Sequence, residues 1–334
     1  MKLGTSLRFL FPTSPQTHES FKRALAAAPA GSFIERPMGA YDTADQARNW
    51  LEVAAAARAA GLDGLLVGDN HAVAASYANC FAPIPSLARL MAVTGEMPVG
   101  MVLLAPFYEP IVLAEQIGTL AAFAQGPLIV ALALGGRAQS FQAFGREQRS
   151  RVGRLEELVA TLRPLLAGER VTFHGRHHTV EAAQVSPLPR VPVSIWIAGT
   201  VRAAAERAGR LGDGWLTGQN ASTADLAEQL EAYREAAARA GRQPLPVLRR
   251  DIFVGESDAG ASAEVDPILV EGYRGTGRDT LLVGGPATVV QQLQEYRAMG
   301  FEHVMVRHVT GDHARMLESF ERIGRHVMPA IRDL

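Results

Sequence analysis

The sequence predicts a single TIM barrel, a ring of eight parallel strands each followed by a helix. Eight short apolar runs alternate with amphipathic segments along 334 residues, a length that suits one large α/β barrel. Most runs are continuous and rich in aliphatic residues, as in strands buried on both faces. Hydrophobic residues make up 48% of the chain and charged residues 20%, which excludes disorder over most of its length. We therefore expect one domain over residues 1–334.

The predicted elements follow one another at regular intervals from the N-terminus. Asp42 or Thr43 can cap the start of a helix over 43–60, and Gly61 follows its end, as expected at a helix terminus. Strands are expected at 3–11, 64–68, 98–105, 127–134, 192–198, 213–217, 247–254 and 303–309. Further helices are expected at 110–125, 150–167, 201–210, 223–240, 286–299 and 312–327.

Three stretches interrupt this alternation and predict insertions after strands 1, 4 and 7. Residues 12–41 carry Pro, Gly, Ser and aromatic residues and are expected to form a long loop. Residues 168–190 are expected to form a β-hairpin, and the polar, glycine-rich residues 255–285 a mobile insertion. Loops that follow barrel strands lie at the catalytic face, so the first and third insertions are predicted to act as lids.

Charge and composition exclude several classes of function. The chain has 33 basic and 34 acidic residues, a net charge of −1, so it has no overall positive field for nucleic acid. Its one cysteine, Cys80, cannot form an internal disulfide or a thiolate metal cluster, which suits the cytoplasm. The apolar runs are too short to cross a membrane and no secretory signal is evident. The hairpin residues His174, His177 and His178 are expected to form a solvated face and not a metal site.

The end of the second strand carries the best candidates for acid–base catalysis. Asp69, Asn70 and His71 follow that strand at the predicted catalytic face. A histidine near a carboxylate can exchange a proton close to neutral pH, so His71 is a candidate general base. The structural alternative is a loop histidine that is held only by hydrogen bonds.

Two glycine-bearing turns are candidates for binding a phosphate group. Gly199 and Thr200 lie where the fifth strand ends and the next helix begins, and Arg202 could add positive charge there. Gly135, at the end of the fourth strand, is a second such turn. Each could instead be an ordinary turn at a strand end. The helix that follows the fourth strand carries Arg151 and Arg154 on one face, and Arg154 could pair with Glu157 on the surface.

Taken in order along the chain, five stretches resemble the bacterial-luciferase-like family of flavin-dependent oxidoreductases. They are LLVGDNH, MVLLAPFYEPIVLAEQIGTLAAFAQG, LALGGRAQSFQAFG, SPLPRVPVSIWIAGTVRAAAERAGRLGDGW and VGGPATVVQQLQEYRAMGFEHVMV. No single motif is specific, but the ordered set extends from near residue 1 to about 330.

The resemblance implies a TIM-barrel enzyme, usually dimeric, that binds a flavin. The flavin ring would lie over the third strand near Met101 and Val102, where family members often have a non-proline cis peptide bond. Arg151 or Arg154 would be the arginine of the phosphate helix. The remaining cofactor-binding residues that the resemblance implies are Gly135, Ala198, Gly199 and Thr200.

The main functional hypothesis is an FMN-dependent monooxygenase that uses reduced flavin and O₂ on a small organic substrate. A separate flavin reductase would supply the reduced cofactor, whose chemistry the protein directs. Asp69, Asn70 and His71 would be the polar groups of the pocket, with Tyr108 and Trp196 as its walls. One alternative is a reductase or dehydrogenase that uses a deazaflavin coenzyme. A second is a non-catalytic flavin-binding relative, because Asn70 replaces a histidine that is common in the family.

The family resemblance also implies a homodimer. The helical segments 84–92 and 111–124 are more apolar than packing on the barrel requires, so they are candidates for the contact between subunits. Deep packing on the barrel is the alternative explanation.

Overall fold

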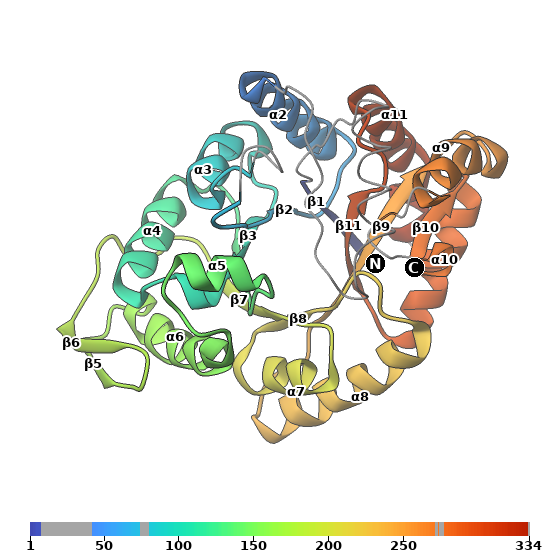
Figure 1. Cartoon of the computed structure of the whole chain (residues 1–334). Helices are drawn as coiled ribbons and strands as arrows, with labels where there is room; N and C mark the ends of the chain where they lie inside the picture. Colours follow the sequence, from blue (N-terminus) through green and yellow to red (C-terminus); the bar gives the residue numbers. More distant parts are fainter. Residues whose placement is uncertain (8–41, 74–79, 271–272, 274–276, 333–334) are drawn as a thin grey trace.

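The eight predicted strands form one closed parallel barrel. The computed structural model describes residues 1–7, 42–73, 80–270, 273 and 277–332, and the barrel lies at the centre of Figure 1. Pairing of the short strand β8 with β9 closes the ring. In ring order, the strands are β1 (Lys2–Ser6), β2 (Leu65–Val67), β3 (Val99–Leu104), β4 (Leu128–Ala133), β7 (Val193–Ala198), β8 (Gly214–Leu216), β9 (Pro246–Val254) and β11 (His303–His308). The predicted barrel is confirmed.

Helices surround the barrel, as Figure 1 shows. Asp42 caps the first of them by accepting a hydrogen bond from the Ala44 N–H at 2.7 Å. The ring contains α2 (Thr43–Ala59), α3 (Pro83–Thr94), α4 (Pro110–Phe123), α6 (Arg151–Leu166), α7 (Arg202–Leu211), α8 (Thr223–Arg239), α10 (Pro286–Met299) and α11 (His313–Arg322). The π-helical η4 (Ile323–Val327) leads from α11 into α12 (Met328–Arg332), and the short α5 (Ala138–Ala143) follows β4. The other predicted helices form within one or two residues of their expected bounds, whereas the one expected at 312–327 becomes π-helical after Arg322 and continues to Arg332.

Alternation of side chains along the strands divides the core into two layers. Outward residues such as Met101 pack against the helices in the larger cluster. Inward residues fill the barrel itself: Leu66, Ile129, Ala131, Trp196, Leu216, Val247 and Met305. Because this inner layer is filled by apolar side chains, any functional cleft must lie above it, at an end of the barrel.

The predicted hairpin is present as β5 (Val171–His174) and β6 (Thr179–Ala183), which pair antiparallel. Its turn is held by Glu157 of α6, whose carboxylate accepts the backbone N–H groups of 176, 177 and 178 at 2.8 to 2.9 Å. Burial raises the pKa of Glu157, but these donors outweigh it and leave the pKa below its usual value. Glu157 therefore binds the hairpin instead of the expected partner Arg154, because three charge-assisted hydrogen bonds surpass one surface ion pair.

The sequence predicted that the three hairpin histidines lie on a solvated face, but the structure does not place all of them there. His174 is exposed beside Glu181, but the side chain of His178 is fully buried and its Nδ1 lies 3.2 Å from Glu109. Burial lowers the pKa of His178, although Glu109 opposes this effect. The prediction was wrong for His178 because the hairpin folds against α6 and its turn reaches Glu109, just before α4, which no local pattern reveals.

The predicted mobile insertion at 255–285 is partly regular structure. It contains α9 (Asp258–Val270), η3 (Arg278–Thr280) and the parallel strand β10 (Leu281–Gly284). The strand β10 pairs with the C-terminal half of β9, from Asp251 to Val254. Because β9 extends well beyond the short β8, its outer edge would otherwise lack hydrogen-bond partners. The expected lid at 12–41 lies outside the described residues.

The helices expected to join two subunits lie side by side on the barrel. Among the described residues, α4 exposes Val112 and Phe123, whose side chains are 53% and 75% accessible. Pairing of two copies through α3 and α4 stays a prediction. None of the described helices is long and apolar enough to cross a membrane.

Candidate functional site at the carboxyl ends of the strands

The carboxylate of Asp69 organises the polar end of β2. Its side chain is fully buried, and Oδ2 lies 3.1 Å from His71 Nε2. The same oxygen accepts the Tyr108 hydroxyl at 3.0 Å and the Leu104 N–H at 2.9 Å. These groups meet because β2 and β3 are neighbouring parallel strands, with Val67 opposite Met101, so their carboxyl ends coincide. The other carboxylate oxygen, Oδ1, has no hydrogen-bond partner in the described part of the chain.

His71 is held between the Asp69 carboxylate and a cage of aromatic rings. Phe107, Tyr108 and Phe144 contact the imidazole edge to face, with ring centroids 5.3, 5.6 and 5.4 Å away. The side chain is 25% exposed, and no hydrogen bond engages its Nδ1 within the described residues. With Nε2 donating to Asp69, Nδ1 remains available to accept a proton from a molecule in the barrel mouth.

Asn70 and Tyr108 have supporting positions in this arrangement. Asn70 is exposed and its side chain hydrogen-bonds the Cys80 thiol, whose pKa burial raises to about 11, with Arg137 opposing the shift. Burial, followed by the charge of Asp69, raises the pKa of Tyr108 above its usual value. Tyr108 therefore stays protonated and orients Asp69, and its place in the pocket wall stays a prediction. Of the three predicted catalytic residues, Asp69 and His71 are hydrogen-bonded to each other, whereas the Asn70 side chain bonds to Cys80.

The residues predicted to lie under a flavin ring face opposite sides of β3. The side chain of Met101 packs outward against the helices, whereas Val102 faces the barrel interior beside Trp196. Trp196 is buried in that inner layer, beneath the mouth. In the described residues the cis peptide bond is Ser186–Pro187, so β3 lacks the cis bond that the resemblance implied. Unbroken parallel pairing with β4 along its whole length keeps β3 regular.

The turn between β7 and α7 has the features of an anion site. The Gly199 N–H donates to Leu216 O at 3.1 Å, and the Thr200 carbonyl accepts from Gln229 at 3.3 Å, so both sides of the turn are fixed. No side chain caps the N-terminus of α7, which leaves backbone N–H groups for a ligand. Arg202 is turned away and pairs with Glu206 and Glu228 on the surface. Ala198 lines the inner wall just before the turn.

The two candidate arginines of α6 differ in position. Arg151 donates through Nη1 to the carbonyl of Gly135 at 3.3 Å, next to a turn in which Gly135 has a φ of 66°. Arg154 contacts the hydroxyl of Ser150 at 3.2 Å, and burial followed by the charge of Arg146 lowers its pKa. Arg151 is therefore the arginine of this helix that reaches the loop after β4.

Sequence reasoning missed a charged cluster on the last two barrel strands. Arg307 of β11 donates to Asp251 of β9 at 2.7 Å, and Tyr273 donates to the same carboxylate at 2.7 Å. Arg249 lies two residues before Asp251, on the same face of β9. The available signal was charge at alternate positions of two otherwise apolar strands, VLRRDIFV and HVMVRHV. We call Arg249, Asp251, Arg307 and Tyr273 the β9–β11 cluster.

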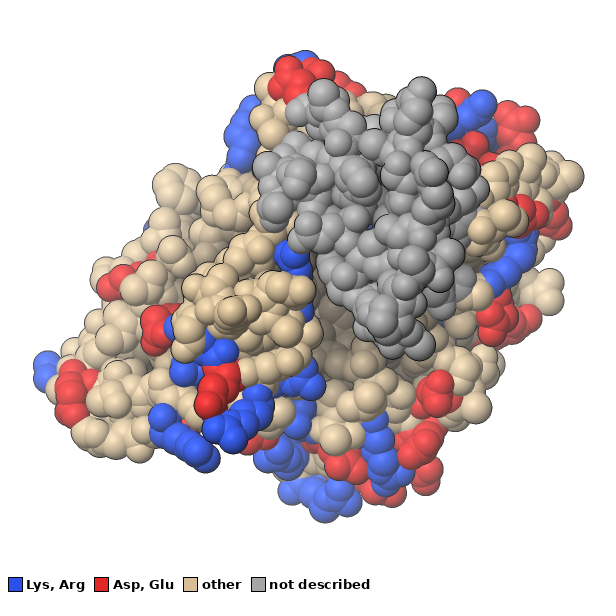
Figure 2. All heavy atoms as spheres, in the orientation of Figure 1, with Lys and Arg blue, Asp and Glu red and all other residues tan. Residues whose placement is uncertain are grey.

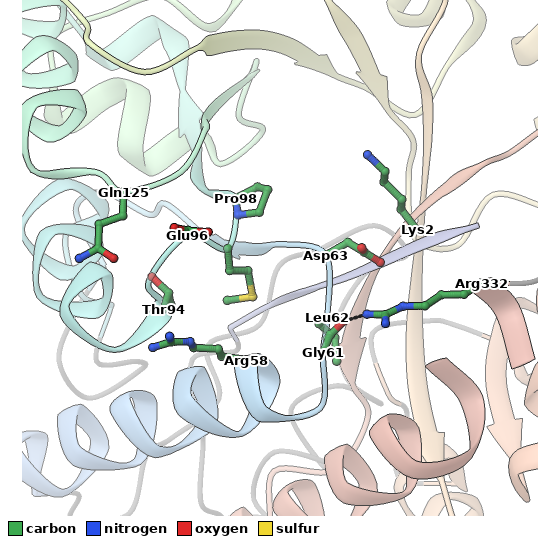
Figure 3. A pocket seen from close by; sticks show the side chains of 11 residues that line it. Lys2, Arg58, Gly61, Leu62, Asp63, Thr94, Glu96, Pro98, Gln125 and Arg332 are labelled. Carbon is green, nitrogen blue, oxygen red and sulfur yellow. Dashed lines mark hydrogen bonds between the residues drawn. The ribbon is translucent and has the colours of Figure 1, made fainter. Parts of the chain in front are cut away.

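A hollow of about 530 Å³ lies at the opposite end of the barrel. Figure 3 shows basic side chains, such as Arg58 and Arg332, and the acidic side chains of Asp63 and Glu96 around it. Asp63 and Glu96 precede the strands β2 and β3. Barrel enzymes carry out their chemistry at the carboxyl ends of the strands, so this hollow is not the candidate site. On the face in Figure 2, basic and acidic side chains are interspersed around the rim of the part of the chain that the structure describes.

Comparisons with known proteins place this geometry among redox enzymes. The sequence profile of the luciferase-like monooxygenase family matches residues 29–277. The F420-dependent glucose-6-phosphate dehydrogenase of Rhodococcus erythropolis is 27% identical over 323 residues, which cover 86% of this chain and 94% of that protein. The enzyme of the same name from Mycobacterium avium is 28% identical over 323 residues, with 86% and 95% covered.

Solved structures share the fold over most of the chain. The monooxygenase RslO1 from Streptomyces bottropensis superposes with a TM-score of 0.79 at 20% identity, covering 98% of this chain and 99% of that one. An F420-dependent secondary alcohol dehydrogenase, in complex with an F420–acetone adduct, gives 0.72 at 20% identity, with 86% and 96% covered. At these identities the likeness concerns the fold alone.

Proposed function

The chain belongs to the luciferase-like monooxygenase family, and we propose that it is a deazaflavin-dependent oxidoreductase that transfers hydride between coenzyme F420 and a small organic substrate. The chain is an oxidoreductase of the flavin or deazaflavin class. Within that class, the sequence alone favoured FMN and O₂, whereas the relatives support the deazaflavin alternative better. Those relatives match 86% of the chain at 27% and 28% identity, above the 20% of the monooxygenase structure.

The hydrogen-bonded Asp69–His71 pair carries the proposal in the structure. Oxidation of an alcohol removes a hydride from carbon and a proton from oxygen, and a deazaflavin, when bound, would supply the hydride acceptor. His71 Nδ1 takes the hydroxyl proton, and the Asp69 carboxylate, 3.1 Å from Nε2, stabilises the positive charge that forms on the ring. Tyr108 and the Leu104 N–H hold Asp69 in place. In the reverse direction, protonated His71 returns its proton to the carbonyl oxygen.

The residues around the barrel mouth fit a phosphate-bearing coenzyme of this kind. The uncapped N-terminus of α7, with Gly199 and Thr200 before it, supplies backbone donors for a phosphate. The turn packs so closely on α7 that a Cβ at Gly199 would lie 2.2 Å from Ala204 Cβ. Val102 and Ala198, which are only partly buried on the inner wall, provide apolar contacts for a ring system.

Direct titration of the purified protein with both coenzymes tests the proposal. We expect F420 to bind roughly a hundredfold more tightly than FMN, measured by the change in intrinsic fluorescence of each coenzyme on binding. Tight FMN binding without F420 binding would contradict the proposal and support the FMN-dependent monooxygenase hypothesis. Binding of neither coenzyme, with the protein folded by circular dichroism, would favour the non-catalytic relative.

Substituting Gly199→Ala is expected to weaken F420 binding by about tenfold or more, because the added Cβ must push the turn away from α7. The matched control is Gly136→Ala, since a Cβ at Gly136 meets no atom within 4 Å. Dissociation constants come from the same fluorescence titration, with the melting temperature of each variant as a check of folding. Equal affinity of both variants for F420 would show that the β7–α7 turn does not bind the coenzyme.

A further inference from the structure

The β9–β11 cluster faces the barrel interior at its carboxyl end. Val247 and Met305 belong to the inner layer, and side chains alternate along a strand, so Arg249, Asp251 and Arg307 point to the same side. Register places Arg249 opposite Met305 and Asp251 opposite Arg307. Because β8 ends beside Val247, Arg249 lies beyond the end of β8 and directly above the apolar layer.

The cluster carries an excess of positive charge. Arg307 Nη2 lies 2.7 Å from Asp251 Oδ2 and 3.1 Å from the Tyr273 hydroxyl, so this guanidinium has the carboxylate as its partner. Arg249 has no carboxylate or hydrogen-bond acceptor for its guanidinium among the described residues. Among the residues that the structure describes, two guanidinium groups therefore face one carboxylate, an excess of one positive charge in a largely buried place.

Unsatisfied donors accompany this charge. The Nε atoms of Arg249 and Arg307 are buried and make no hydrogen bond within the described ranges. Burial, followed by the nearby charge of Arg307, lowers the pKa of Arg249 to about 10, so it is still protonated at neutral pH. Burial of an uncompensated cation is costly, and a bound anion removes that cost. A planar guanidinium with several donors suits a carboxylate or phosphate group.

We propose that Arg249 and Arg307 bind a negatively charged group of the substrate, a carboxylate or phosphate, in the mouth of the barrel. The ring order β9–β11–β1–β2 puts the cluster on the same rim as the Asp69–His71 pair, with β1 between β11 and β2. The substrate is then held at its anionic end by the β9–β11 cluster while its reacting carbon lies toward His71. The assignment of the ligand as a substrate rests on the proposed function, but the anion site itself can be tested without coenzyme.

Inorganic phosphate and acetate are the probes, added to the coenzyme-free protein at constant ionic strength with chloride as the balancing anion. We expect saturable binding of phosphate or acetate by isothermal titration calorimetry, and at least about tenfold weaker binding in Arg249→Gln. The conservative Arg249→Lys variant is expected to recover part of the affinity, because it keeps the charge. The control is Arg325→Gln. Arg325 lies on η4, is exposed and pairs with Glu321. This variant is expected to bind both anions as the parent protein does.

Addition of F420 distinguishes the sources of the anionic group. The part of phosphate binding that depends on Arg249 is the difference between the parent protein and Arg249→Gln. We expect this part to be unchanged when F420 is bound, because the coenzyme phosphate is proposed to bind at α7. Its loss on addition of F420 would overturn the substrate assignment and assign the cluster to the coenzyme. Undiminished phosphate and acetate binding in Arg249→Gln, with its fold intact by circular dichroism, would overturn the site itself. Phosphate binding that depends on Arg249, in a protein that binds no F420, would support the anion site while contradicting the proposed function.

Discussion

Replacing His71 by glutamine is expected to lower kcat by roughly a hundredfold to ten-thousandfold, because the variant loses the group that takes the substrate proton. The affinity for F420 should change little, since His71 lies at the end of β2 whereas the turn proposed to bind the coenzyme phosphate precedes α7. Glutamine keeps a polar side chain of similar reach, so it limits the disturbance of the aromatic cage formed by Phe107, Tyr108 and Phe144. The measurement is steady-state reduction of F420, followed by its visible absorbance, with alcohols as candidate donors.

The matched control for this prediction is His174→Gln. His174 lies on the hairpin strand β5, is 65% exposed and pairs with Glu181 at 3.1 Å. Its replacement is expected to leave kcat and the F420 affinity unchanged. A His71→Gln variant that retains most of the parent kcat would rule out His71 as the general base and leave Asp69 without a catalytic role.

Truncation of Arg250 to alanine is expected to destabilise the protein by about 3–5 kcal/mol, the largest effect on folding that we predict. The side chain is completely buried, and within the described ranges its guanidinium donates to carbonyls and to the Tyr296 hydroxyl and to no carboxylate. It donates to Gly218 O at 3.4 Å, Gln219 O at 3.0 Å and Ala221 O at 2.8 Å, and lies over the Tyr296 ring at 4.9 Å. Truncation leaves these carbonyls without their donor and opens a cavity between β9 and α10.

The same substitution is expected to weaken F420 binding, because the loop that Arg250 holds supports the β7–α7 turn, which is proposed to bind the coenzyme phosphate. Gly218 packs so tightly on Thr200 that a Cβ there would lie 2.5 Å from Thr200 Cγ2. The free energy of unfolding is measured by urea denaturation. Arg239→Ala, at the exposed end of α8, is the control and is expected to unfold almost as the parent does. Unchanged stability of Arg250→Ala would show that water replaces the guanidinium at no cost.

The candidate site was predictable where chemistry and position coincide in the sequence. Asp69 and His71 are two residues apart at the end of a strand, so their pairing follows from local geometry. The role of Tyr108 was not predictable, because its hydroxyl reaches Asp69 only when β2 and β3 lie side by side. The same holds for Glu157, whose partners lie about 20 residues away in the hairpin.

The amino-acid sequence by itself determined the barrel. Eight apolar runs that alternate with amphipathic segments of the right lengths bury their apolar surfaces when the strands form a closed parallel ring covered by the helices. It also placed Gly199 and Thr200 at the start of a helix, since glycine and strand ends are local signals. Only the tertiary structure decided which charges meet. Arg249 and Arg250 are neighbours in the sequence, yet one faces the barrel mouth and the other is bonded to backbone carbonyls outside it. Side chains alternate between the two faces of a strand at every residue, so the difference between the arginine proposed to bind a ligand and the structural one lies in what packs against each face.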